Sequence, residues 1–311
     1  MILSASRRTD IPAFYSDWFF RRIQEGYLLV RNPLNSKQIS RINLSPSVID
    51  CIVFWTKNPQ PMLSRLNELK DYKYYFQFTL NSYDVSIEPN VARKKDLIKT
   101  FANLSNIIGK EKVVWRYDPI ILTDVFTKEY HYKWFEILAS HLYQYTNRCV
   151  ISFLDLYKKT ERNLRKVVLH PIQRNDMEEI AERFSHIASK YNLIIESCSE
   201  KIDLKKYNIQ HGKCIDDKLI SEMLKQNLHL DKDPNQRNEC GCVQSIDIGA
   251  YSTCKHGCLY CYANFSNDTV HKNIQMHNIK SPILIGKLTG DEKITDREMY
   301  SFINAQISFL D

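Results

Sequence analysis

Residues 49–55 read Ile49-Asp-Cys-Ile-Val-Phe-Trp55, and polar residues follow them directly. A short apolar run that is rich in β-branched and aromatic residues and bounded by polar ones is typical of a buried strand of a parallel sheet. The same pattern occurs at residues 2–6, 74–80, 113–117, 149–154, 193–197 and 243–248, and more weakly at 27–30. We therefore expect seven or eight strands.

Stretches with helical apolar spacing separate these strands, at residues 16–25, 62–69, 93–107, 128–145, 174–191 and 218–225. Alternating strands and helices predict a parallel sheet. Seven or eight strands in 311 residues favour an α/β fold of the (β/α) TIM-like barrel type, with residues 1–311 as a single domain. A doubly wound open sheet is the alternative, although the glycine fingerprint of its nucleotide-binding members is missing.

Composition excludes several classes of protein. The chain carries 43 Lys and Arg against 36 Asp and Glu, a net charge of +7, and this mild excess does not by itself indicate nucleic acid. A hydrophobic content of 43% excludes a disordered chain. No apolar run reaches the ~18 residues of a membrane span, and the first ten residues lack the apolar region of a secretory signal. We expect a cytoplasmic protein without membrane contact.

Polar residues follow most of the predicted strands. In a barrel these strand ends converge on the C-terminal face, where active sites are built. Arg7, Arg8 and Asp10 follow the first strand and are candidates for binding a carboxylate, a phosphate or a ribose; a structural ion pair is the alternative. Asp247 lies within the last strand, where its carboxylate is expected to bond neighbouring backbone or a cofactor. Lys57, Asn58, Arg116, Asp118, Asp155, Glu196, Glu200 and Tyr251 occupy equivalent strand-end positions.

Cysteine is the most informative residue type. Seven of the nine cysteines fall within 64 residues, where uniform scattering would place roughly two. The odd count, the chain length and the absence of an export signal argue against a disulfide framework. Residues 198–265 are therefore predicted to be a cysteine-rich metal-cluster segment. Cys51 and Cys149 lie in apolar runs and are predicted to be buried core thiols.

The segment Cys254-Lys-His-Gly-Cys258-Leu-Tyr-Cys261-Tyr-Ala has the spacing C-x3-C-x2-C. Three thiolates on one short loop suit three irons of a cubane cluster and leave the fourth iron without a protein ligand. An open coordination position is typical of a reactive metal site. A structural zinc site with His256 as fourth ligand is the alternative, and incidental thiols are a third.

This motif resembles that of radical S-adenosylmethionine enzymes, in which the residue before the last cysteine is aromatic, as Tyr260 is here. The Tyr-Cys-Tyr-Ala ending is similar to the spore photoproduct lyase branch. The resemblance implies that Cys254, Cys258 and Cys261 ligate a [4Fe–4S] cluster whose open iron chelates S-adenosylmethionine. It also implies that Tyr260 contacts the adenine and that reductive cleavage yields a 5′-deoxyadenosyl radical. A reductant such as flavodoxin or ferredoxin would be the partner.

The chain as a whole is similar to the domain-of-unknown-function 1848 family. The matching pieces are Ser6-Arg-Arg-Thr-Asp-Ile-Pro12, Phe54-Trp-Thr-Lys-Asn-Pro59, Trp115-Arg-Tyr-Asp-Pro119, Gln236-Arg-Asn-Glu-Cys-Gly-Cys242 and Ser245-Ile-Asp-Ile-Gly249. The cluster motif of radical enzymes usually follows the first barrel strand, whereas here it follows the last. A circularly permuted barrel accounts for this position, with residues 283–286 and then 2–6 as the next strands. The Gly-Gly-Glu segment of those enzymes has no counterpart.

Four further cysteines, Cys198, Cys214, Cys240 and Cys242, make a complete ligand set for a second cluster or a zinc ion. Unliganded thiols are the alternative. A closed four-thiolate cluster here would relay electrons or anchor this part of the barrel.

Lys158, Lys159, Arg162, Arg165 and Lys166 form a basic run, which we interpret as a solvated helix face rather than a phosphate contact. The function expected is radical hydrogen abstraction from an unknown substrate. The alternatives are a metal-stabilised module that binds nucleic acid or protein without catalysis, and an iron–sulfur electron carrier.

Overall fold

Eight parallel strands form the main sheet of the chain. The computed structural model describes residues 1–156, 158–228 and 230–303; the side chains of Lys158 and Lys159 and residues 304–311 of the predicted domain lie outside the description. The strand order is β10-β1-β4-β5-β6-β7-β8-β9. Their bounds are β1 (Ile2–Ala5), β4 (Cys51–Thr56), β5 (Tyr74–Thr79), β6 (Val113–Ile120), β7 (Arg148–Phe153), β8 (Ile194–Ser197), β9 (Gln210–His211) and β10 (Ile246–Asp247).

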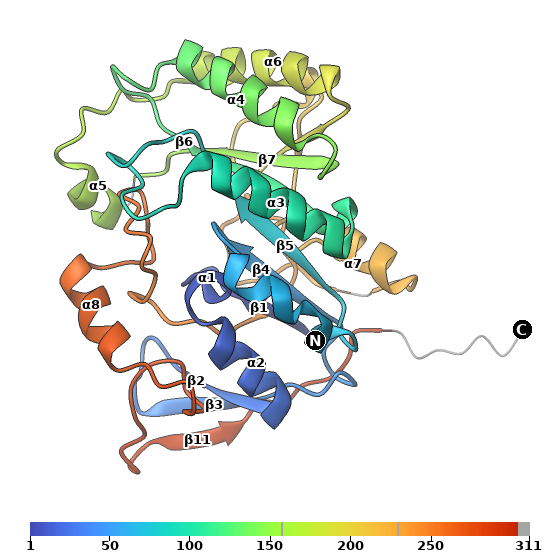
Figure 1. Cartoon of the computed structure of the whole chain (residues 1–311), viewed down its shortest axis with the longest axis vertical. Coiled ribbons are helices and arrows are strands. Elements are labelled where there is room, and N and C mark those ends of the chain that lie inside the picture. The colour runs from blue at the N-terminus through green and yellow to red at the C-terminus, as the bar shows by residue number, and fades with distance from the viewer. Residues whose placement is uncertain (157, 229, 304–311) are drawn as a thin grey trace, which may run out of the picture.

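Amphipathic helices cover one face of this sheet, and their apolar residues form one core cluster with every second strand residue, such as Leu3, Ile52 and Phe76 (Figure 1). These helices are α1 (Ile11–Phe14), α2 (Ser16–Glu25), α3 (Lys94–Ile108), α4 (Lys128–Leu142), α6 (Arg174–Lys190) and a 3₁₀ helix at Gln60–Leu69. Short 3₁₀ turns occur at Lys110–Lys112 and Lys205–Tyr207.

The other face of the sheet is filled by the chain that follows β9. Cys51, Val53 and Tyr75 point to this face and pack with Cys214, Cys242 and residues of α7 (Asp217–Leu224) in a second buried cluster. The Tyr75 hydroxyl and the Gln77 amide both donate to the backbone oxygen of Cys214, at 2.6 and 2.9 Å. Burial on both faces explains why the strands read as almost unbroken apolar runs.

A second sheet has the order β11-β3-β2, with β2 (Tyr27–Arg31), β3 (Gln38–Asn43) and β11 (Lys293–Asp296). It lies beside α2, away from α4 and α6 (Figure 1). The strand expected at 27–30 is thus real but belongs to this smaller sheet, not to the main one.

The predicted closed barrel is wrong for the described residues, because β9 and β10 stand at opposite edges and do not pair. The doubly wound alternative also fails, since the strand order does not reverse and the long helices share one face. Residues 283–286 do not continue the ring: β10 pairs directly with β1, and Ile283 only bridges to Leu29. Two-residue β9 and β10 are too short to close the sheet. The fold is an α/β structure with one singly wound, open parallel sheet.

The remaining helices are α5 (Lys158–Leu164) and α8 (Asn267–Gln275). No helix in the described part of the chain is long and apolar enough to cross a membrane. Cys51 and Cys149 are fully buried, which confirms them as core thiols.

His131 gives the fold an acid-sensitive position. It lies buried on α4, with its Nδ1 2.7 Å from the Tyr117 hydroxyl and its Nε2 2.9 Å from the Ile121 oxygen. Burial lowers the pKa of His131 to about 4. The unfolded chain therefore takes up a proton near pH 6.5 that the folded chain does not, and stability is lost as the pH falls from 6.5 toward 4.

We expect urea unfolding of the metal-free chain to lose about 2 kcal/mol more between pH 7 and pH 5 in the native protein than in the variant His131→Gln. Equal losses in both proteins would contradict this assignment.

Candidate functional site

One cavity lies at the C-terminal ends of the parallel strands, with a volume of about 810 Å³. All seven clustered cysteines line it: Cys198, Cys214, Cys240, Cys242, Cys254, Cys258 and Cys261. Residues that follow four different strands also line it, namely Arg7, Arg8 and Asp10 after β1, Lys57 after β4, Asp118 at the end of β6 and Asp155 after β7. The convergence expected for the strand ends is therefore observed in part, although the sheet is open: Arg116 and Tyr251 also line the cavity, whereas Asn58, Glu196 and Glu200 are not among its lining residues.

The loop that carries Cys254, Cys258 and Cys261 is anchored to the segment after β5. The backbone N–H of Leu259 donates to the Ile87 oxygen at 3.0 Å, and the Asn90 amide donates to the Lys255 oxygen at 2.9 Å. Gly257 has a φ of +67°, and a side chain there would meet Asn90. The loop is thus a tight turn that brings three cysteines to one wall of the cavity.

Of the three cysteines of this loop, Cys258 is buried, and Cys254 and Cys261 are half-buried. Burial raises the pKa of Cys254 well above its ordinary value and that of Cys258 to about 12. The nearby Lys57 ammonium acts in the opposite direction on Cys258 but does not outweigh the burial.

Asp10 joins three elements beneath this loop. Its carboxylate accepts hydrogen bonds from the backbone N–H of Ala13, which caps α1, from the backbone N–H of Lys57 at 2.7 Å, and from His256 Nε2 at 2.8 Å. His256 therefore presents its other nitrogen, Nδ1, which is buried and has no hydrogen-bond partner among the described residues. In the tautomer that carries its proton on Nε2, this nitrogen is a free acceptor in the cysteine loop.

Asp247 connects β10 to β1. One of its oxygens accepts from the Ser6 hydroxyl at 2.6 Å and from the N–H of Gly249, and the other accepts from the Ser4 hydroxyl and the N–H of Arg7, both at 2.8 Å. A side chain at Gly249 would collide with Ser6, so this close crossing requires glycine. The contacts of Asp247 are with the chain itself, which is one of the two roles expected for it.

Asp247→Asn tests this junction. Each carboxylate oxygen accepts one backbone N–H, so an amide places its NH2 group against a donor that cannot turn away. We expect the free energy of unfolding of the metal-free chain to fall by about 2–3 kcal/mol, as for loss of a buried charge-assisted hydrogen bond. Asp71→Asn, at an exposed position, is the control and should change it by less than about 0.5 kcal/mol. Equal effects would contradict the assigned role.

The two arginines after β1 both contact aromatic rings at the cavity. The Arg7 guanidinium lies 5.8 Å from the Trp55 ring centre and 3.9 Å from Asp233, and the Arg8 guanidinium lies 5.2 Å from the Tyr251 ring centre. Arg8 also approaches Asp247 at 3.8 Å. Both ion pairs are long, so each guanidinium keeps donors for an anionic ligand.

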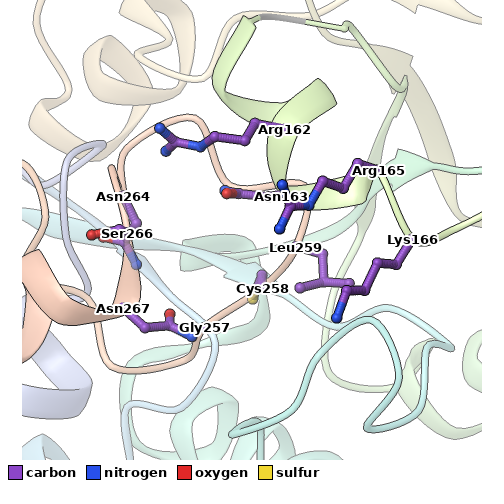
Figure 2. A pocket seen from close by; sticks show the side chains of 10 residues that line it. All are labelled: Arg162, Asn163, Arg165, Lys166, Gly257, Cys258, Leu259, Asn264, Ser266 and Asn267. Atoms are coloured by element: carbon purple, nitrogen blue, oxygen red, sulfur yellow. The ribbon is translucent and has the colours of Figure 1, made fainter.

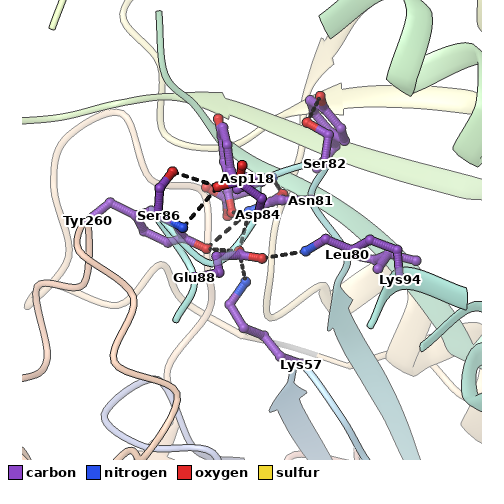
Figure 3. A network of polar contacts seen from close by, with 12 residues as sticks. Lys57, Leu80, Asn81, Ser82, Asp84, Ser86, Glu88, Lys94, Asp118 and Tyr260 are labelled. Carbon is purple, nitrogen blue, oxygen red and sulfur yellow. Dashed lines mark hydrogen bonds and ion pairs between the residues drawn. The ribbon is translucent and has the colours of Figure 1, made fainter. Parts of the chain in front are cut away.

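A buried network surrounds Tyr260 (Figure 3). The Glu88 carboxylate accepts hydrogen bonds from the Lys57 ammonium at 2.7 Å and the Lys94 ammonium at 2.6 Å. It also accepts from the Tyr260 hydroxyl, and the oxygen of that hydroxyl accepts in turn from the Asn81 amide at 3.1 Å. Burial opposes ionisation of Glu88, but the two ammonium groups outweigh it and lower its pKa to about 2. Sequence reasoning missed Glu88 and Lys94, because neither lies in a motif or directly after a strand.

The other four cysteines form a chain of thiols on the opposite side. The sulfurs of Cys198 and Cys214 are 3.2 Å apart, and Arg116 Nη1 lies 2.9 Å from the Cys214 sulfur. The Cys242 thiol forms hydrogen bonds with the thiols of Cys214 and Cys240, and all four cysteines are free. A hydrogen bond from Cys242 lowers the pKa of Cys240 to about 7. The structure thus brings together residues that are 44 positions apart in sequence, from 198 to 242.

The two groups of cysteines differ from a site for a single metal ion. Among the described residues, no three His, Cys, Asp or Glu side chains converge as ligands of one metal ion. The donors in each group are thiols, which select zinc, copper(I) and iron–sulfur clusters rather than magnesium or calcium. The thiolates of a cubane bind different irons and need not converge on one point. The thiol donors are thus of the chemical type that a cluster takes, while no converged metal site is formed among the described residues.

The fold and the cavity together define the class of protein. It is an α/β protein with one open parallel sheet and a cavity at the strand ends that is lined by thiols, the ligands that soft metals prefer. The sequence model described as "Domain of unknown function (DUF1848)" matches residues 2–263, and the chain belongs to this family. The match includes all seven clustered cysteines.

Among curated proteins, none matches this sequence. Among solved structures, the chain is similar to a crystal structure of a candidate alpha-L-fucosidase from Bacteroides thetaiotaomicron. The identity is 10%, the TM-score is 0.26, and the alignment covers 70% of this chain and 84% of that one. At this TM-score and identity, the similarity supports no conclusion about the fold or the chemistry of this chain.

Proposed function

We propose that this protein is an iron–sulfur enzyme of the radical S-adenosylmethionine type acting on an unknown substrate. Cys254, Cys258 and Cys261 hold a [4Fe–4S] cluster in this proposal, and the open sheet is a circularly permuted relative of the barrel of such enzymes. The observation that carries it is the position of the C-x3-C-x2-C loop, which forms one wall of an 810 Å³ cavity ringed by polar strand ends. When bound, the cluster supplies one-electron reduction of S-adenosylmethionine.

The residues around the loop have distinct roles in this proposal. Tyr260, fixed by Glu88 and Asn81, presents its ring for the adenine. Arg7 and Arg8 bind the anionic end of the cofactor or the substrate, because their guanidinium groups are only loosely paired.

His256 compensates for the missing Gly-Gly-Glu segment. With the ring proton on Nε2, held by Asp10, the unpartnered Nδ1 would accept a hydrogen bond from the methionyl amino group. The same nitrogen favours the alternative of a closed zinc site with three cysteines and His256, in a binding module without catalysis.

Cys198, Cys214, Cys240 and Cys242 hold a second cluster in our proposal. They line the same cavity as the first three cysteines, so an electron from a reductant such as flavodoxin or ferredoxin has a short route between the two sites. The neighbouring Arg116 guanidinium offsets the negative charge of four thiolates.

The test is cofactor cleavage by the reduced protein after anaerobic reconstitution with iron and sulfide. We expect 5′-deoxyadenosine and methionine to form from S-adenosylmethionine, detected by mass spectrometry. His256→Phe should weaken S-adenosylmethionine binding while the iron content stays constant. Zinc without iron in the purified protein, or no cleavage by fully reconstituted protein, would overturn the proposal in favour of the binding module or the electron carrier, respectively.

A further inference from the structure

A second cavity, of about 310 Å³, lies on the outer side of the cysteine loop. Figure 2 shows α5 on one side of it and the loop and the start of α8 on the other. Its lining residues are Arg162, Asn163, Arg165, Lys166, Gly257, Cys258, Leu259, Asn264, Ser266 and Asn267. Of the described residues, Cys258 is the one that both cavities share.

The charged side chains in the described lining of this cavity are all basic. Arg162, Arg165 and Lys166 line it, and its described lining includes no Asp or Glu. Arg162 is held in place, since it donates to the Phe265 oxygen and lies 5.4 Å from the Phe265 ring centre. Arg162, Arg165 and Lys166 are all exposed, which confirms the solvated face predicted for them, and they also border this cavity.

The N-terminus of α8 faces the same space. This helix has nine residues, and Ser266 caps it by accepting from the backbone N–H of Thr269. Ser266 and Asn267 line the cavity, whereas the acidic Asp268 of the first turn is exposed and does not. The remaining backbone N–H groups and the helix dipole favour an anion at this end.

Asn264 is a second, independent indication of a ligand, because one of its polar atoms lacks a hydrogen-bond donor. Its residue is only 6% exposed, and its Nδ2 donates to the Cys254 oxygen at 2.8 Å. Its Oδ1 is buried and has no partner among the described residues, and Asn264 is one of the residues that line the cavity. A buried acceptor without a donor is costly, so this oxygen fits a ligand that brings a hydroxyl or amino group.

We propose that this cavity binds a phosphate monoester of a small hydroxylated molecule, with the phosphate on Arg162, Arg165, Lys166 and the α8 N-terminus and a hydroxyl on Asn264. A volume of about 310 Å³ is at the lower end of small-molecule sites. The inference goes beyond the proposed function and does not depend on it, because the residues that carry it are not metal ligands.

The experiment is isothermal titration calorimetry on the full-length, metal-free chain. The probes are inorganic phosphate, glycerol 3-phosphate, and a single-stranded oligonucleotide without terminal phosphates. We expect glycerol 3-phosphate to bind more tightly than inorganic phosphate, since it adds the hydroxyl for Asn264. Arg165→Ala and Lys166→Ala should each weaken its binding about tenfold or more, as expected for loss of a charge-assisted hydrogen bond.

Lys272→Ala is the matched control, because it removes the same charge from an exposed position on α8 that does not line the cavity. It should weaken binding less than twofold. Equal effects of Lys272→Ala and the two cavity variants, equal binding of phosphate and glycerol 3-phosphate, or binding of the oligonucleotide alone would overturn the proposal. Circular dichroism verifies that each variant is folded. Because the chain is metal-free, a failure here is distinct from a failure of the cluster assignment.

Discussion

Replacing Cys254, Cys258 and Cys261 together by alanine is expected to halve the iron of the reconstituted protein, from about eight to about four atoms per chain. The variant should also lose all cleavage of S-adenosylmethionine, because the open coordination position belongs to this loop. The four other cysteines keep their contacts, since the thiol chain from Cys198 to Cys240 does not involve the loop. Iron analysis and product detection are the measurements.

The matched control is Cys149→Ala, which removes a thiol that is fully buried in the helix-facing core rather than on the cavity. It should leave the iron content and cofactor cleavage unchanged. The reciprocal variant, with Cys198, Cys214, Cys240 and Cys242 replaced, should keep about four irons. If the loop variant kept its full iron content, the assignment of the first cluster would be wrong.

The second large effect is expected at Glu88. Glu88→Gln removes the carboxylate charge that both Lys57 and Lys94 bind, and the side chains of these lysines are only 12% and 19% exposed. Breaking a buried ion pair by removing one partner costs about 3–5 kcal/mol, because the other charge stays buried without compensation. We expect a loss of this size in the free energy of unfolding of the metal-free chain, measured by chemical denaturation.

Glu136→Gln is the control for Glu88, since Glu136 pairs with Lys190 at the surface, where both side chains are about 40% exposed. Its loss should stay below about 1 kcal/mol. A similar small loss for Glu88→Gln would contradict the role of Glu88 as the charge centre of this network. Tyr260 binds the same carboxylate, so the variant should also weaken S-adenosylmethionine binding if the proposed adenine contact is correct.

The main sheet was largely predictable from the sequence, because strands covered on both faces must be apolar throughout. The runs at 49–55 and 74–80 correspond to β4 and β5 within one or two residues at each end. Sheet closure was not predictable, because it depends on the edges. The run at 243–248 forms only the two-residue β10. The backbone N–H of Val243 donates instead to the Ile215 oxygen, on the face of the sheet opposite the long helices.

The residues of the candidate site were predictable where they cluster in the sequence or directly follow a strand. The cysteines and Arg7, Arg8 and Asp10 line the cavity for these two reasons. Glu88 was not predictable, because its position depends on a loop after β5 that packs against the cysteine loop and on two lysines from separate elements. Likewise, Arg162 and Arg165 line the second cavity because of the position in which α5 packs, and a basic run in the sequence does not specify that position.

The most direct test of the central claim is the iron and sulfide content of anaerobically purified protein, combined with EPR of the reduced protein titrated with S-adenosylmethionine. We expect about eight irons per chain and a cluster spectrum that changes on addition of S-adenosylmethionine, because one cluster has an open coordination position. Zinc without iron, or an iron–sulfur spectrum that the cofactor leaves unchanged, would contradict it.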